Sequence, residues 1–216
     1  MVKAYLGIDP GLTNIGLTLR MAGSSVFVSD YIRINVPIPV KRGFANNQEQ
    51  TNWKLRQVFF RVRQAVKDLI ASQGLQPEEV FGAIEAFLYR PSTSGKSFNN
   101  ASYDTVAAVA TVKAVLFDVG IEFVEIISTQ MRRILTWHAN GFPDDTLDKD
   151  AVEDVVKQVL GKSSVDALLS LYAKGHHEHI VDSMAFSIVV EYRSAYQEYM
   201  KLPLKKRKQM LESKKT

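Results

Sequence analysis

The sequence predicts an α/β fold in which helices cover both faces of a mixed five-stranded sheet. Three strand-like segments follow one another near the N-terminus, and two later strands alternate with long helical segments. The 216 residues are 46% apolar, which is enough chain to bury one sizeable core. We therefore expect one domain over residues 1–200, followed by a basic tail over residues 201–216.

The N-terminal strands are expected to form an antiparallel meander. Residues 3–9 form a buried strand that ends at the Pro10-Gly11 turn, and Ile15–Arg20 and Val26–Ile34 follow it after short turns. The segment from Val36 to Gln50 lacks a clear periodicity and is expected to be a polar loop.

The middle of the chain alternates between helix and strand. Apolar residues recur at helical spacing from Asn52 to Ser72, and a strand follows at Val80–Glu85. A loop rich in Ser, Gly and Asn at Tyr89–Asn100 leads into a helix at Ala101–Val119. That helix is apolar on nearly every side, so one face should cover the sheet and another needs a second cover, which makes it a candidate subunit interface.

One strand and three helical segments complete the predicted fold. The strand is expected at Ile121–Ile127, and the helices at Thr129–Trp137, Leu147–Leu160 and Ser163–Tyr199, the last with a break near Gly175.

Composition excludes several classes of protein. Because the chain has no cysteine, it cannot form disulfides, thiolate metal sites or thiol nucleophiles. No apolar run approaches the roughly 20 residues that a membrane-spanning helix needs. The first eight residues are too short and strand-like for a signal peptide. We expect a soluble cytoplasmic protein without a membrane partner.

The net charge of +4 is distributed unevenly. Residues 201–216 contain seven Lys or Arg and one acid, whereas the first 200 residues sum to −2. A basic tail on a near-neutral body indicates a polyanionic partner, and nucleic acid is the first candidate. From charge alone, a solubilising, disordered end explains the tail equally well.

Three acids stand where the predicted elements would present them to one cleft. Asp9 and Glu85 each end a buried strand, and Asp182 lies in the last helical segment, with His179 three residues and Glu178 four residues before it. A buried carboxylate is costly unless its charge is compensated, and hard divalent cations prefer oxygen ligands. Any one acid could simply end a turn or a strand, but the set indicates a metal site suited to phosphodiester chemistry.

Five segments, taken in order, resemble the motifs of one family. The first is Gly7–Gly16 (GIDPGLTNIG), which is fairly specific, and the second is Ala83–Glu85. The others are Phe123–Arg132, Lys149–Val152 and His179–Ala185. They resemble the motifs of the RuvC family of Holliday-junction resolvases, within the RNase H-like superfamily. The likeness covers about residues 3–190 and implies an RNase H-like fold.

The resemblance implies a Mg²⁺-dependent endonuclease, with Mn²⁺ able to substitute, that resolves four-way DNA junctions. By this likeness Asp9, Glu85 and Asp182 hold two metals, with Asp9 between them, and His179 binds metal or positions the attacking water. Glu178 is the alternative to His179 for completing the site. The products would be a 3′-hydroxyl and a 5′-phosphate. Because a four-way junction presents two equivalent strands, a twofold homodimer is expected.

The same likeness implies a set of DNA contacts. The family inserts an aromatic side chain from the loop after the second motif into the junction, and Phe87 and Tyr89 bracket that position, which holds Leu88. The basic residues expected to contact DNA are Arg90, Lys96, Arg132, Arg133 and Lys149. The chain departs from the family in its long Val36–Gln50 and His138–Thr146 segments and in its basic tail.

Other motifs are weaker. Gly95-Lys96-Ser97 resembles the end of a nucleotide-binding loop, but Arg90 stands where that motif requires glycine, so no nucleotide cofactor is expected. The Asp118-Val119-Gly120 segment ends a helix, unlike the second phosphate turn of actin-like ATPases. His176 and His177 are interpreted as a solvated helix start. The remaining alternatives are a nuclease of the same superfamily that cuts other branched DNA or RNA, and a non-catalytic nucleic-acid-binding protein of the same fold.

Overall fold

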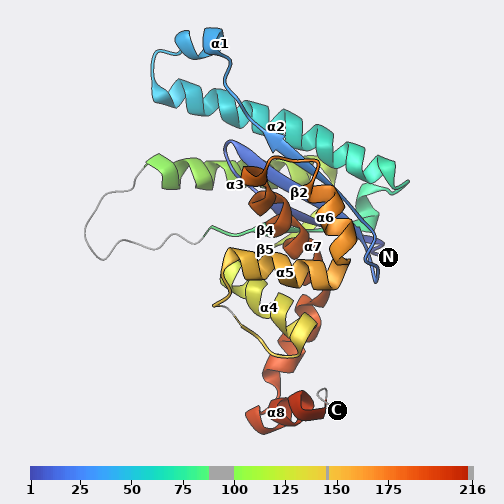
Figure 1. Cartoon of the computed structure of the whole chain (residues 1–216). Helices are drawn as coiled ribbons and strands as arrows, with labels where there is room; N and C mark the ends of the chain where they lie inside the picture. Colours follow the sequence, from blue (N-terminus) through green and yellow to red (C-terminus); the bar gives the residue numbers. More distant parts are fainter. Residues whose placement is uncertain (88–99, 145, 214–216) are drawn as a thin grey trace, which may run out of the picture.

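A five-stranded sheet forms the centre of the protein (Figure 1). The computed structural model describes residues 1–87, 100–144 and 146–213. The strands, in sheet order, are β3 (Phe27–Arg33), β2 (Asn14–Met21), β1 (Ala4–Asp9), β4 (Val80–Glu85) and β5 (Glu122–Ile126). The first three strands in sequence are antiparallel, and β4 and β5 run parallel to β1. The predicted mixed sheet and N-terminal meander are confirmed.

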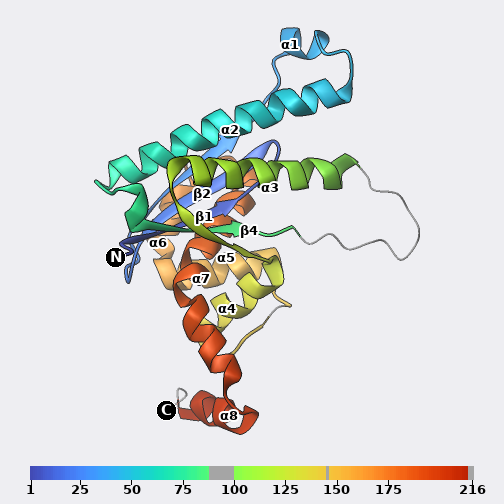
Figure 2. The ribbon, with the colours of Figure 1, turned by 180° about the vertical axis from the view of Figure 1, so that it is seen from behind.

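Helices cover both faces of this sheet (Figures 1 and 2). One face carries α2 (Asn47–Ser72) and α3 (Asn100–Val119), which share a core with β1 and β2. The other face carries α4 (Ser128–Asn140), α5 (Lys149–Leu160), α6 (Lys162–Leu169) and α7 (His177–Lys201). The short elements are α1 (Ile38–Arg42), η1 (Pro77–Glu79), η2 (Lys174–His176) and α8 (Leu204–Ser213). Within the described ranges, no helix is long and apolar enough to cross a bilayer.

Two expected segments are more ordered than the sequence indicates. The expected loop from Val36 to Gln50 holds α1 and the first turn of α2. Helix α2 starts early because the side chain of Asn46 accepts the backbone N–H of Glu49 at 2.9 Å, and the carboxylate of Glu49 accepts the N–H of Ala45 at 2.7 Å. The basic tail likewise contains a helix, α8.

Helix α7 rests directly on the backbone of β1 and β2 at two glycines. A Cβ atom at Gly7 would lie 2.0 Å from the carbonyl oxygen of Ser183, and one at Gly16 would lie 1.9 Å from the carbonyl oxygen of His179. Only a residue without a side chain fits at either position. These glycines of the first motif therefore set how closely α7 approaches the sheet.

A buried ion pair also fixes α7 to the β2–β3 hairpin. The side chain of Arg20 is 2% exposed and pairs with Glu191 of α7. It also donates to the carbonyl oxygen of Ser187 at 3.2 and 3.3 Å, and to that of Ser24 at 2.8 Å. Because these groups satisfy the buried guanidinium, the contact holds the hairpin and helix in one register.

Candidate active site

Two carboxylates meet at the carboxyl edge of the parallel strands. Ile8 pairs with Ile84 in the β1–β4 ladder, so the next residues, Asp9 and Glu85, follow side by side. Asp9 is 7% exposed. Burial, and then the neighbouring charge of Asp9, raise the pKa of Glu85 from 4.5 to about 7. Near neutral pH Glu85 is therefore partly protonated, and a hydrogen bond between its carboxyl group and Asp9 contributes to the rise in its pKa.

The start of α4 supports Glu85. The hydroxyl of Ser128 donates to the Oε1 atom of Glu85, and the charge of Arg132, one turn later, partly opposes the rise in the Glu85 pKa. The Nε atom of Arg132 is buried and has no hydrogen-bond partner among the residues that the structure describes. Sequence reasoning did not find Ser128. The sequence could have indicated Ser128 by its position two residues after Ile126, the β5 residue that pairs with Glu85.

His179 approaches Asp9 from α7. Its Nδ1 atom lies 2.6 Å from the Oδ2 atom of Asp9. That hydrogen bond raises the pKa of His179 above its usual 6.5, with smaller contributions in the same direction from the charges of Glu178 and Asp182, whereas burial opposes the rise. Asp9 is thus bonded by Glu85 on one side and by His179 on the other.

The aromatic ring of Tyr31, from β3, packs near His179. The sequence did not predict this contact. The ring of Tyr31 stacks on those of His176 at 4.5 Å and His179 at 6.3 Å between centroids. Its hydroxyl donates to the Oδ1 atom of Asn14 at 2.6 Å and lies 2.9 Å from the Nδ1 atom of His176. His176 thus stands at the start of α7, as predicted, but its ring is half-buried against Tyr31 and not simply solvated. The strand register explains this contact, because Tyr31 pairs with Gly16 across the sheet and His179 lies over Gly16.

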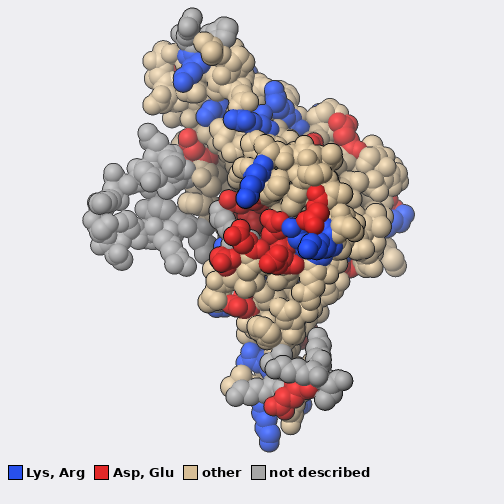
Figure 3. Space-filling view, viewed as in Figure 1, with Lys and Arg blue, Asp and Glu red and all other residues tan. Residues whose placement is uncertain are grey.

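Asp182 lies beside this group but faces a different hollow. Together with Glu178, it lines a small pocket of about 210 Å³ between the start of α7 and α5. The other polar residues that line this pocket are Asp150, Glu153, Lys174 and His177. Acidic side chains gather in one patch over these elements, with basic side chains beside them (Figure 3). The structure thus brings together Asp9, Glu85 and His179, and it places Asp182 with Glu178 next to them.

The expected DNA-contacting residues fall in three groups. Phe87 is 39% exposed, two residues beyond Glu85. Arg132 is partly buried near Glu85, and Arg133 is exposed. Tyr89, Arg90 and Lys96 lie outside the described residues. Lys149 begins α5, but its side chain is also outside the described part.

The donor set suits a hard divalent cation in its chemistry. A buried carboxylate, a half-buried carboxylate and an imidazole offer oxygen and nitrogen ligands, and burial together with the charge of Asp9 raises the pKa of Glu85. Among the described residues, no three His, Asp or Glu side chains form a preassembled metal-ligand cluster. A bound ion would therefore replace the hydrogen bonds that Asp9 now makes to Glu85 and His179.

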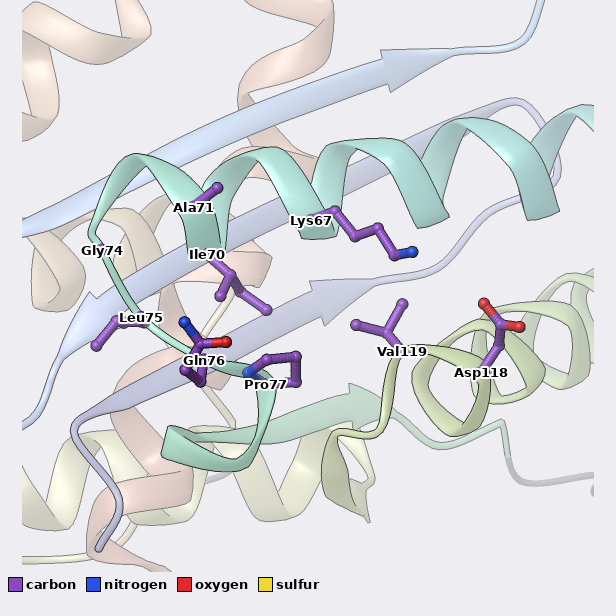
Figure 4. Close-up of a pocket in the computed structure, with 9 residues that line it drawn as sticks. All are labelled: Lys67, Ile70, Ala71, Gly74, Leu75, Gln76, Pro77, Asp118 and Val119. Atoms are coloured by element: carbon purple, nitrogen blue, oxygen red, sulfur yellow. The ribbon is translucent and has the colours of Figure 1, made fainter.

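A larger hollow lies elsewhere and lacks this chemistry. It has a volume of about 540 Å³ and lies between the C-terminal ends of α2 and α3 (Figure 4). Among the described residues that line it, the one acid is Asp118, whose carboxylate accepts a hydrogen bond from Arg63 at 2.5 Å. We therefore place the candidate active site at the carboxylates of β1 and β4.

Comparison with known proteins identifies the fold. No protein-family model matches the sequence, and no curated protein matches it. Among solved structures, the chain is similar to Thermus thermophilus RuvC in complex with a Holliday junction substrate, with a TM-score of 0.57 and 15% identity over 89% of this chain and 95% of that one. It is also similar to a second Thermus thermophilus RuvC structure, with a TM-score of 0.51 and 19% identity over 89% and 96%. The chain has the RNase H-like fold of the RuvC resolvases.

Proposed function

We propose that this protein is a metal-dependent endonuclease that resolves four-way DNA junctions by phosphodiester hydrolysis. The observation that carries the proposal is the neighbouring pair of buried Asp9 and half-buried Glu85, with His179 bonded to Asp9, at the strand edge of a RuvC-like fold. A fold alone does not fix a function. Two neighbouring carboxylates and an imidazole inside such a fold, however, offer the ligands that metal-assisted hydrolysis needs.

Asp9, Glu85 and His179 would hold Mg²⁺, or Mn²⁺ in its place, with Asp182 completing the set. When bound, the cations would stabilise the charge that develops on the phosphate and favour ionisation of the attacking water. Asp9 contributes a carboxylate held by neighbours on both sides, and Ser128 orients Glu85. His179 accepts or releases a proton at an imidazole whose pKa Asp9 raises.

The DNA would reach this site across the predicted basic residues. Arg132 lies near Glu85, and Arg133 is exposed on the same helix. Phe87 presents an exposed ring just beyond the strand edge, which suits an aromatic wedge in the junction. We assign Tyr89, Arg90, Lys96 and Lys149 the same DNA-binding role on the resemblance alone.

A homodimer would place two such sites on one junction. Helix α3 exposes an apolar stripe at helical spacing, and the side chain of Phe60 on the adjacent α2 is 63% exposed. The stripe consists of Tyr103, Val106, Ala110, Ala114 and Phe117. Because a junction has two equivalent strands to cut, we assign this apolar stripe to the contact with a second copy of the chain.

A cleavage panel tests the proposal. Four-way junction, flap, duplex and RNA hairpin substrates would be incubated with the protein and Mg²⁺. We expect paired cuts in the junction and little cleavage of the duplex. Preference for the flap or for RNA would support the alternative, a nuclease of the same fold with another branched substrate. Binding of the junction without any cut, in Mg²⁺ or Mn²⁺, would indicate a non-catalytic binding protein.

A further inference from the structure

The basic end of the molecule has no part in the site described above. It consists of the last residue of α7, Lys201, and the first residues of α8, Lys205, Lys206 and Arg207. Lys205 and Lys206 are exposed. Helix α8 projects at the far end of α7, away from the sheet (Figures 1 and 2). Glu198 pairs with Lys201, and Glu212 lies in α8, so the excess of positive charge on this protruding element comes from Lys205, Lys206 and Arg207.

The position of α8 is fixed by contacts with the end of α7. The guanidinium of Arg207 lies 5.9 Å over the ring of Tyr199 and donates to the sulfur of Met200 at 3.4 Å. Tyr199 is buried and packs against Trp137 of α4, with ring centroids 5.4 Å apart. Because Leu202 also packs against this core, the connection between α7 and α8 is anchored.

Two helices connect the candidate active site to this basic end. Helix α7 carries His179 in its first turn, and α4 carries Ser128 against Glu85 at its first residue. Both helices run away from the carboxylates, and their far ends meet where Trp137 contacts Tyr199. A ligand that extends from the site along these helices would reach α8.

The length of α7 matches one turn of duplex DNA. Lys201 lies 22 positions after His179, so the two residues are about 33 Å apart along the helix at a rise of about 1.5 Å per residue. One turn of B-form DNA is about 34 Å long, so a strand returns to the same face of the duplex after that distance. A backbone that lies at the carboxylates would face the protein again near α8.

We infer that the basic end binds the phosphate backbone of a duplex arm about one helical turn from the cleaved bond. This inference rests on the proposed function, because it takes the carboxylates as the point where the DNA is cut. Charge complementarity and the spacing both favour double-stranded DNA as the ligand. Lysine side chains recognise phosphate without regard to sequence, so the contact would set position and affinity and would not select a sequence.

The test compares junctions with long and short arms. The variant Lys205→Gln/Lys206→Gln removes two exposed charges, and Lys67→Gln/Lys162→Gln removes two exposed charges from α2 and α6 as the matched control. Dissociation constants would be measured in EDTA with arms of about 16 bp and about 7 bp, because only the longer arms reach one full turn. Cleavage of both junctions in Mg²⁺ would be recorded in parallel.

We expect the α8 variant to bind the long-arm junction more weakly, by up to about 60-fold in 0.1 M salt, with a salt slope smaller by about 2. On the short-arm junction, it should match the unaltered protein. An unchanged affinity, an equal loss on both junctions, or an equal loss in the control variant would overturn the inference. If the unaltered protein binds with the expected arm-length dependence but cuts nothing, the proposed function fails and the α8 contact stands. If it binds neither junction, both fail.

Discussion

The carboxylate pair makes a prediction about stability that does not require activity. Glu85→Gln replaces a side chain whose pKa is about 7 in the folded protein and 4.5 as its ordinary value. Glutamine keeps the acceptor for Ser128 and offers Asp9 an N–H where protonated Glu85 offers an O–H. The substitution therefore mimics the protonated form and removes only the cost of ionisation.

The direction and size of the pH effect on stability follow from the linkage between proton binding and folding. Because folding raises the pKa of this carboxyl, the folded protein is at full stability below about pH 4.5 and loses stability as the pH rises through about 7. The loss approaches about 3 kcal/mol at pH 8 and is about 1 kcal/mol at pH 5. Glu85→Gln should remove this loss, so its advantage over the unaltered protein should grow by about 2 kcal/mol between these pH values.

Urea unfolding in EDTA at pH 5 and pH 8 measures this difference. His179, whose pKa is raised by its hydrogen bond to Asp9, is present in both proteins, so its contribution cancels to first order in their difference. Glu78→Gln, which changes an exposed carboxylate, is the matched control and should give the same small effect at both pH values. An advantage of Glu85→Gln that does not grow with pH would refute the raised pKa of Glu85. Added Mg²⁺ should stabilise the unaltered protein at pH 8 more than it stabilises Glu85→Gln.

Other substitutions test the remaining parts of the account. His179→Ala should lose most junction cleavage while it folds, and Glu178→Ala should retain cleavage; the opposite ranking in a rate assay would assign the role to Glu178. Tyr31→Phe keeps the ring against His179 and should cut normally with a stability loss of about 1 kcal/mol, whereas Tyr31→Ala should lower kcat without changing Kd for the junction. Arg20→Met removes the ion-pair partner of Glu191, which keeps the N–H of Gly23, and should cost about 3–5 kcal/mol in urea unfolding. Arg20→Met/Glu191→Met should cost less, and equal costs would contradict the pairing.

The parts of the fold that the sequence predicted well are those with local signals. Strand β4 has the predicted ends, Val80 and Glu85, because an apolar run stops at an acid. The start of α2 was placed five residues too late, because the polar residues around Asn46 form a cap only when their side chains turn back to the backbone. The helix in the basic tail was missed because its composition resembles that of a solvated tail.

The candidate site likewise contains residues that the sequence could predict and a choice that it could not decide. Asp9 and Glu85 could be proposed from sequence because each ends a strand, and parallel pairing then brings them together. Spacing alone could not decide between His179 and Glu178, since the choice depends on how α7 lies on the sheet. That placement follows from contacts of the helix with Gly7 and Gly16, which are distant in sequence.

The most direct test of the central claim is one paired measurement on Asp9→Asn. The substitution removes a charge from the centre of the carboxylate group but no expected phosphate contact. We predict that four-way junction cleavage in Mg²⁺ falls to background, while the junction Kd in EDTA stays close to that of the unaltered protein. Cleavage that persists, or a loss of binding as large as the loss of cleavage, would contradict the assignment of these carboxylates to catalysis.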